Sequence, residues 1–177
     1  GPFAHILAST DFGFAMIDAT TIDHKTTQQR YRDFHSDWAD KVTAEAAFFK
    51  SHHVDLVLTD VAYLPLAGAA QAGIRAMSMC SLNWADLFSH YYGHETGARK
   101  IHHEILAAYR QAKPFFRPIP SMPMAELAEL PEPLMRLFVR RWFEAVDPAN
   151  AVGKADGLLM HLDQRDDLAE MRCNPML

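Results

Sequence analysis

The chain has 177 residues, of which 49% are hydrophobic and 22% are charged, a composition typical of a folded protein and not of a disordered one. Its 17 Lys and Arg against 22 Asp and Glu give a net charge of -5, so no general attraction to nucleic acid is expected. Two cysteines are too few for a disulfide framework. No apolar stretch reaches the about 20 residues of a membrane span. These features favour a cytoplasmic protein without nucleic-acid or transmembrane function.

The amino-terminal quarter predicts a strand, a loop and one long helix. Residues 3–8 are apolar and run into the polar, turn-forming residues 9–13, as at the carboxyl end of a strand. Residues 26–51 contain neither Gly nor Pro, and their apolar residues recur at steps of three and four. This spacing predicts a single amphipathic helix over 26–51.

The next segment predicts a strand–helix–strand unit. Residues 54–60 read as a buried strand, residues 65–72 as a helix of small residues that Gly73 stops, and residues 75–81 as a second strand. Such a unit nearly always has parallel strands and a right-handed crossover. We therefore expect an α/β fold, a Rossmann-like parallel sheet with flanking helices.

The second half predicts helices joined by one extended segment. Residues 83–92 form a helix with Ser81 or Asn83 as its cap, and residues 101–112 form another. The prolines in residues 114–123 predict a connector or a short edge strand. Residues 134–146 have the pattern of one more amphipathic helix. We expect a Rossmann-like domain over 1–124 and a mostly helical extension packed on it over 125–177.

Candidate ligand-binding residues follow the predicted strands. In open parallel sheets the ligand crevice lies beyond the carboxyl ends of the strands, which directs attention to residues 9–13, 60–63 and 81–86. The candidates are residues with carboxylate, hydroxyl, amide or aromatic side chains, namely Asp60, Tyr63, Ser81, Asn83, Trp84 and Asp86. Sugars need this mixture, because they present hydroxyls at their edges and C–H patches on their faces. Structural roles, as helix caps for the polar residues and as core for Trp84, are the alternative.

Residues 55–74 and 80–86, with 34–38 and 120–124, resemble the amino-terminal domain of bacterial glycosyltransferase-like proteins of the GT-B fold. They are also similar to the front domain of arabinokinase-type sugar kinases. The resemblance covers residues 3–124 and is most specific over 81–86. It implies two facing Rossmann-like domains, the first for the acceptor and the second for the nucleotide-sugar donor.

The chain departs from this family pattern at both ends. No Gly/His-rich loop precedes Phe3, and residues 130–177 do not resemble a donor domain. We therefore expect a sugar- or acceptor-binding domain that is incomplete or inactive alone. Its catalytic residues are unassigned, and it has no cofactor of its own, a nucleotide-sugar donor being needed only with a second domain.

Two other functions stay open. In the first, the chain is a non-enzymatic interaction module that forms a homo-oligomer through an uncovered sheet edge and the 134–146 helix. In the second, it is a metal-dependent enzyme that uses clustered histidines and a glutamate, namely His90, His94, His102, His103 and Glu104. No HExxH motif is present, and Gly93 and Gly97 interrupt the helical register. The sequence therefore predicts no metal site.

Overall fold

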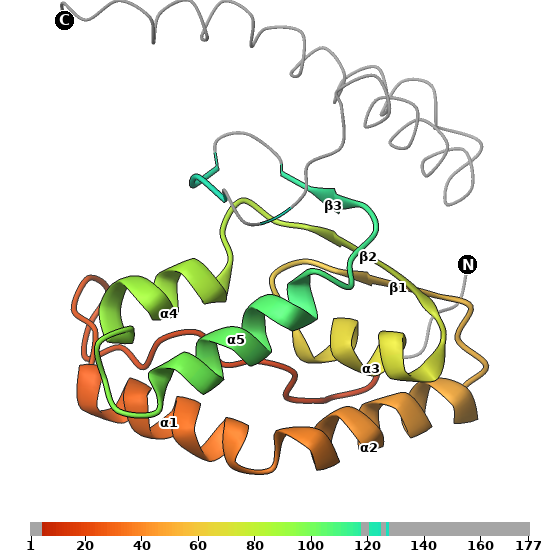
Figure 1. The fold of residues 1–177 in the computed structure, drawn as a ribbon, viewed down its shortest axis with the longest axis horizontal. Helices are drawn as coiled ribbons and strands as arrows, with labels where there is room; N and C mark the ends of the chain where they lie inside the picture. Colours follow the sequence, from red (N-terminus) through yellow and green to blue (C-terminus); the bar gives the residue numbers. More distant parts are fainter. Residues whose placement is uncertain (1–4, 118–120, 125–126, 128–177) are drawn as a thin grey trace, which may run out of the picture. The chain divides into compact units, whose positions relative to one another are not determined.

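The computed structural model describes residues 5–117, 121–124 and 127. These residues form a mixed α/β fold, in which Figure 1 shows the helices on one side of the strands. No helix among them is long and apolar enough to cross a membrane. The elements in chain order are α1 (His24–Ser36), α2 (Trp38–Ser51), β1 (Leu56–Thr59), α3 (Leu64–Ala72), β2 (Arg75–Met79), α4 (Trp84–Tyr92), α5 (Ala98–Tyr109) and β3 (Phe115–Phe116).

The sheet is parallel, as the strand–helix–strand pattern predicts. β1 pairs with β2 so that Leu56 lies opposite Arg75, and β2 pairs with β3 so that Met79 lies opposite Phe116. The order is β1-β2-β3. The segment predicted as a connector or an edge strand thus contributes the short strand β3.

The prediction of one helix over residues 26–51 is wrong, because the chain breaks at Asp37. There φ is -120° and ψ is 36°, which ends α1 and begins α2. α1 also begins two residues early, because the Asp23 side chain accepts a hydrogen bond from the Thr26 backbone N–H. The apolar spacing continues across Asp37, so it gives no sign of the break.

The predicted strand over residues 3–8 is absent from its described part. Residues 5–8 have no regular structure, and the side chain of Leu7 is 88% exposed. A strand needs a neighbour for its backbone N–H and C=O groups, and no described strand pairs with this segment. An apolar sequence alone is therefore not sufficient to form a strand in this segment. The predicted 134–146 helix and, apart from Leu127, the 125–177 extension lie outside the described residues.

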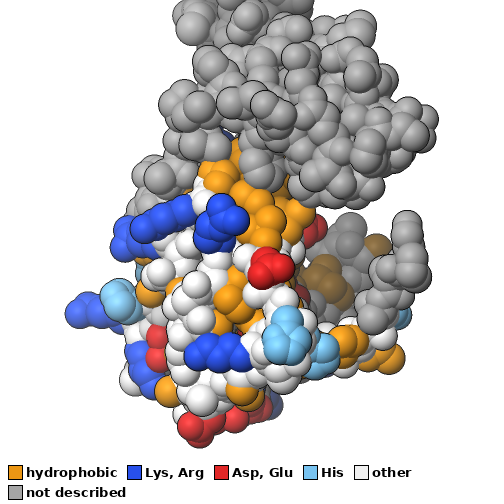
Figure 2. All heavy atoms as spheres, turned by 90° about the vertical axis from the view of Figure 1, so that its right-hand side faces the viewer, with side chains coloured by type: hydrophobic (Ala, Val, Ile, Leu, Met, Phe, Trp, Pro, Cys, Tyr) orange, Lys and Arg blue, Asp and Glu red, His pale blue; other side chains and the backbone are white. Residues whose placement is uncertain are grey.

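The core lies between the sheet and the helices. Val57, Ala76 and Phe115 point from the three strands toward this layer, where Leu66 and Ile105 are fully buried. Alternate residues face the other way, and on that face Leu56 and Leu58 of β1 are 43% and 40% exposed. Figure 2 shows a band of hydrophobic side chains at the surface of the face that it presents.

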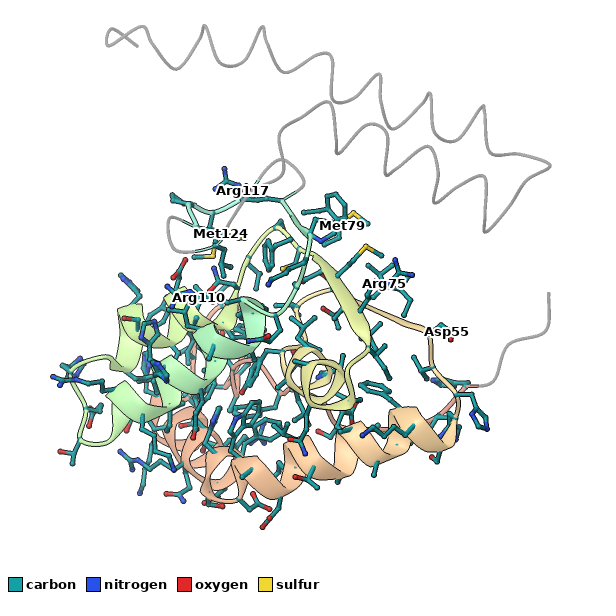
Figure 3. The ribbon with its side chains drawn as sticks, turned by 45° about the vertical axis from the view of Figure 1, so that its right-hand side comes forward. Asp55, Arg75, Met79, Arg110, Arg117 and Met124 are labelled. Atoms are coloured by element: carbon teal, nitrogen blue, oxygen red, sulfur yellow. The ribbon has the colours of Figure 1, made fainter. Side chains whose placement is uncertain are left out.

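On β2, the residues that face away from the helices include Arg75 at one end of the strand and Met79 at the other. These two residues are four positions apart and lie on the face opposite Ala76 and Ser78 (Figure 3). Among the described residues, the sheet is therefore covered by helices on one face only.

α2 and α3 approach closely at Gly68. A Cβ atom at this position would lie 2.5 Å from Cγ and 2.8 Å from Cβ of Glu45. Gly73 then ends α3 with φ at 74°, a left-handed conformation that glycine adopts without steric cost. The predicted stop at Gly73 is thus confirmed.

We expect Leu66→Ala to lower the free energy of unfolding by about 2–5 kcal/mol, because it leaves a cavity in the core. Leu58→Ala makes the same chemical change at a side chain that is already 40% exposed, and we expect it to cost less than half as much. Urea denaturation of both variants measures the difference. Equal losses would contradict the assignment of the core to the helix-covered face.

Candidate functional site

The carboxyl ends of β1 and β2 form one edge, because Thr59 lies opposite Ser78 in the parallel register. The hydroxyl of Ser78 donates a 2.8 Å hydrogen bond to the backbone oxygen of Asp60, which links the two strand ends. The side chains of Asp60 and Ser81 are exposed beyond this edge. A carboxylate and a hydroxyl are therefore available to solvent where a parallel sheet binds ligands.

Asn83 and Asp86 are bonded to each other at the start of α4. Asn83 is fully buried; its side-chain oxygen accepts a 2.8 Å hydrogen bond from the Asp86 backbone N–H. Its amide donates to the Asp86 carboxylate over 2.9 Å. Asn83 is thus the N-cap that the sequence predicted, and both ends of its side chain are used in the cap.

Tyr63 points into the core. Its side chain is 1% exposed, and its hydroxyl lies 3.0 Å from Nε2 of His35. Burial is the main cause that raises the pKa of Tyr63, so the hydroxyl stays protonated and can donate. Tyr63 supports the loop behind Asp60 and does not lie beside Asp60 at the surface.

Trp84 holds the loop that precedes α1. Its indole N–H donates a 2.9 Å hydrogen bond to the Asp11 carboxylate, and its ring packs edge-on against Phe14 at 5.5 Å. Gly13, with φ at 60°, brings the backbone so close that a Cβ atom there would lie 3.0 Å from the indole. Both Trp84 and Asp11 are partly exposed.

Asp11 is a residue that the sequence did not single out, although it falls in the 9–13 segment. Its negative charge is among the causes that raise the pKa values of the three tyrosines buried beneath it, after burial itself. These are Tyr31, Tyr63 and Tyr109. The Tyr31 hydroxyl is buried, and the described residues give it no hydrogen bond. The available signal was the Asp-x-Gly sequence at residues 11–13, in the turn-forming segment that follows the apolar run.

The described residues contain no group of three or more His, Cys, Asp or Glu side chains that could hold a metal ion. The thiol of Cys80 is buried, and burial raises its pKa to about 11. The thiol is therefore protonated at neutral pH and is a poor nucleophile.

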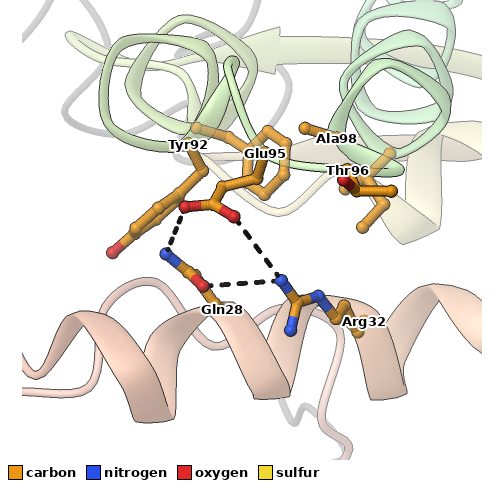
Figure 4. A pocket seen from close by; sticks show the side chains of 8 residues that line it. Gln28, Arg32, Tyr92, Glu95, Thr96 and Ala98 are labelled. Atoms are coloured by element: carbon orange, nitrogen blue, oxygen red, sulfur yellow. Dashed lines mark hydrogen bonds and ion pairs between the residues drawn. The ribbon is translucent and has the colours of Figure 1, made fainter.

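A separate pocket opens between α1 and the loop that joins α4 to α5 (Figure 4). At its rim the Gln28 amide donates to Glu95 over 3.4 Å, and Arg32 lies 3.9 Å from the same carboxylate. The floor is apolar and includes Phe88 and Ile101. None of the six candidate residues lines this pocket, and its polar groups bind one another.

No protein-family model matches this chain, and no curated protein or solved structure matches it either. The resemblance to glycosyltransferase-like proteins therefore stays a prediction.

We expect Trp84→Phe to destabilise the protein by about 1–2 kcal/mol, because it removes a hydrogen bond to a charged, partly exposed group and keeps an aromatic ring. The loop over residues 9–14 should then exchange its backbone amides faster. Trp38→Phe is the matched control, since Trp38 contacts His35 through its ring. Unchanged exchange in the 9–14 loop would contradict the anchoring role of Trp84.

We expect Asn83→Ala to lower the free energy of unfolding by about 1–2 kcal/mol, the usual cost of losing an N-cap. Asn83→Ser keeps an uncharged acceptor for the Asp86 backbone N–H and should lose less than the alanine variant. Thermal melts followed by circular dichroism measure both. A serine variant as unstable as the alanine variant would show that the cap bond is not what Asn83 contributes.

Proposed function

We propose that this chain is a sugar- or glycosyl-acceptor-binding domain of the glycosyltransferase-like type, with a Rossmann-like fold. Its site lies at the carboxyl ends of β1 and β2, where parallel sheets place their ligands. The parallel strand–helix–strand arrangement and the helix-covered face support this proposal. So does the resemblance over residues 3–124, which implies the acceptor half of a GT-B architecture.

The observation that carries the proposal is the pairing of Asp11 with Trp84. The 2.9 Å hydrogen bond fixes a carboxylate beside a partly exposed indole. A sugar can donate its hydroxyl groups to such a carboxylate and pack its C–H face on the aromatic ring. Asp60 and Ser81 add a second carboxylate and a hydroxyl on the exposed strand ends.

The remaining candidate residues act behind this surface. Tyr63 is bonded to His35, and Asn83 is bonded to Asp86. In the proposed site they hold the 60–63 loop and the start of α4 in place, while Asp11, Asp60, Ser81 and Trp84 contact the ligand. The domain by itself binds and does not catalyse, because a nucleotide-sugar donor would need a second domain.

We expect Asp60→Asn to weaken binding of a monosaccharide about tenfold, equivalent to about 1.4 kcal/mol. Asp55→Asn is the matched control, because Asp55 is an exposed aspartate at the opposite end of the same strand. Chemical-shift changes on titration with a panel of neutral monosaccharides and nucleotide-sugars provide the measurement. Absence of binding to every sugar, or equal effects of both variants, would overturn the assignment of the site.

A second candidate function is an oligomerisation module, which the exposed leucines of β1 favour. Leu56 and Leu58 lie on the sheet face that the described helices leave uncovered, and an apolar sheet surface promotes association. Light scattering across a concentration series tests this reading. The oligomerisation function requires the protein to form an oligomer that Leu58→Lys dissociates. A strict monomer at high concentration would exclude this function.

A further inference from the structure

Three elements of the helical layer meet at one histidine. His35, in the last turn of α1, is 3% exposed. Its Nδ1 lies 2.8 Å from a carboxylate oxygen of Glu104 on α5, and its Nε2 lies 3.0 Å from the hydroxyl of Tyr63, which precedes α3. The imidazole ring stacks on Trp38 at 4.9 Å and on Tyr63 at 5.8 Å.

These contacts suit the neutral imidazole. The Glu104 carboxylate can only accept, so Nδ1 carries the proton and Nε2 is left to accept from the Tyr63 O–H. A second proton, bound to Nε2, would point directly at the proton of the Tyr63 hydroxyl. The tyrosine would have to turn its proton away, and within the described residues His35 is the only hydrogen-bond partner recorded for its hydroxyl. Protonation therefore reverses this bond: Nε2–H then donates to the Tyr63 oxygen, and the buried Tyr63 O–H is left without an acceptor among the described residues.

The charges around His35 come from two helices. On α5, Glu104 favours the imidazolium, whereas Lys100, 3.7 Å from the same carboxylate group, opposes it. On α2, Lys41 also opposes it. α3 and α1 contribute the neutral hydroxyl groups of Tyr63 and Tyr31. Burial is the largest effect, and the pKa of His35 lies below its usual value.

The same contact controls the loop behind Asp60. Tyr63 closes this loop at the start of α3, and its hydroxyl is held by His35. At the other end, the hydroxyl of Tyr109 on α5 donates a 2.5 Å hydrogen bond to the backbone oxygen of Val61. The Ser78 hydroxyl also holds the backbone oxygen of Asp60, so a change at His35 loosens the Tyr63 end of the loop while Asp60 and Val61 stay attached.

The geometry points to His35 as a pH-sensitive positioning residue: the neutral imidazole accepts from the Tyr63 O–H beneath the 60–63 loop, and protonation of His35 removes that acceptor and loosens the loop at Tyr63. The loosening itself is a property of the fold. Its effect on ligand binding through Asp60 rests on the proposed function.

The sign of the pH dependence follows from the lowered pKa. The unfolded chain takes up a proton near the ordinary histidine value of about 6.5, whereas the folded protein takes it up only at lower pH. The contribution of His35 to stability is therefore complete above the unfolded value and is lost as the pH falls through the folded value.

The experiment compares thermal melts and backbone amide exchange between about pH 7.5 and pH 5 for three proteins. They are the wild type, His35→Gln and His103→Gln, the last removing an exposed histidine next to Glu104 on the same helix. We expect the wild type and His103→Gln to lose stability on acidification, with faster exchange in residues 61–63. The stability of His35→Gln should depend less on pH.

A second measurement covers the case in which His35→Gln does not fold. A histidine nuclear magnetic resonance titration of the wild type should show His35 protonating below the ordinary histidine value of about 6.5, together with the change in residues 61–63. Protonation of His35 at or above that value, or a pH profile that His35→Gln shares with the wild type, would overturn the proposal. Amide exchange needs no ligand, so failure of sugar binding alone contradicts only the proposed function.

Discussion

A buried histidine with two partners from different helices is the contact on which the arrangement of this fold depends. His35 would be costly to bury without hydrogen bonds, and it finds them only when Glu104 of α5 and Tyr63 at the start of α3 both face it. That requirement constrains how α1, α5 and the start of α3 lie relative to one another. It also ties to α1 the end of the loop that follows β1 and presents Asp60.

Local signals in the sequence were sufficient for the central part of the fold. Gly73 ends α3, Asn83 caps α4, and the apolar run around Val57 forms a strand, because each of these depends on a few neighbouring residues. The break at Asp37 was not predictable, since apolar spacing is the same on both sides of it. The segment over residues 5–8 has the composition of a strand but lacks a described neighbour to pair with.

Only part of the candidate site could be predicted from the sequence, for the same reason. Sequence order places Asp60 and Ser81 after parallel strands, and both are exposed there. Asp11 and Trp84 are 73 positions apart, and His35 and Glu104 are 69 apart, so no local pattern connects either pair. Tyr63 follows a strand end as a ligand-binding residue would, but its side chain turns inward because His35 offers it an acceptor.

The close approach at Gly68 limits which residue this position can hold. With no room for even a methyl group between α3 and Glu45 of α2, any other residue at position 68 would push the two helices apart. Because Tyr63 is the residue before α3, such a shift would also displace the end of the loop that presents Asp60.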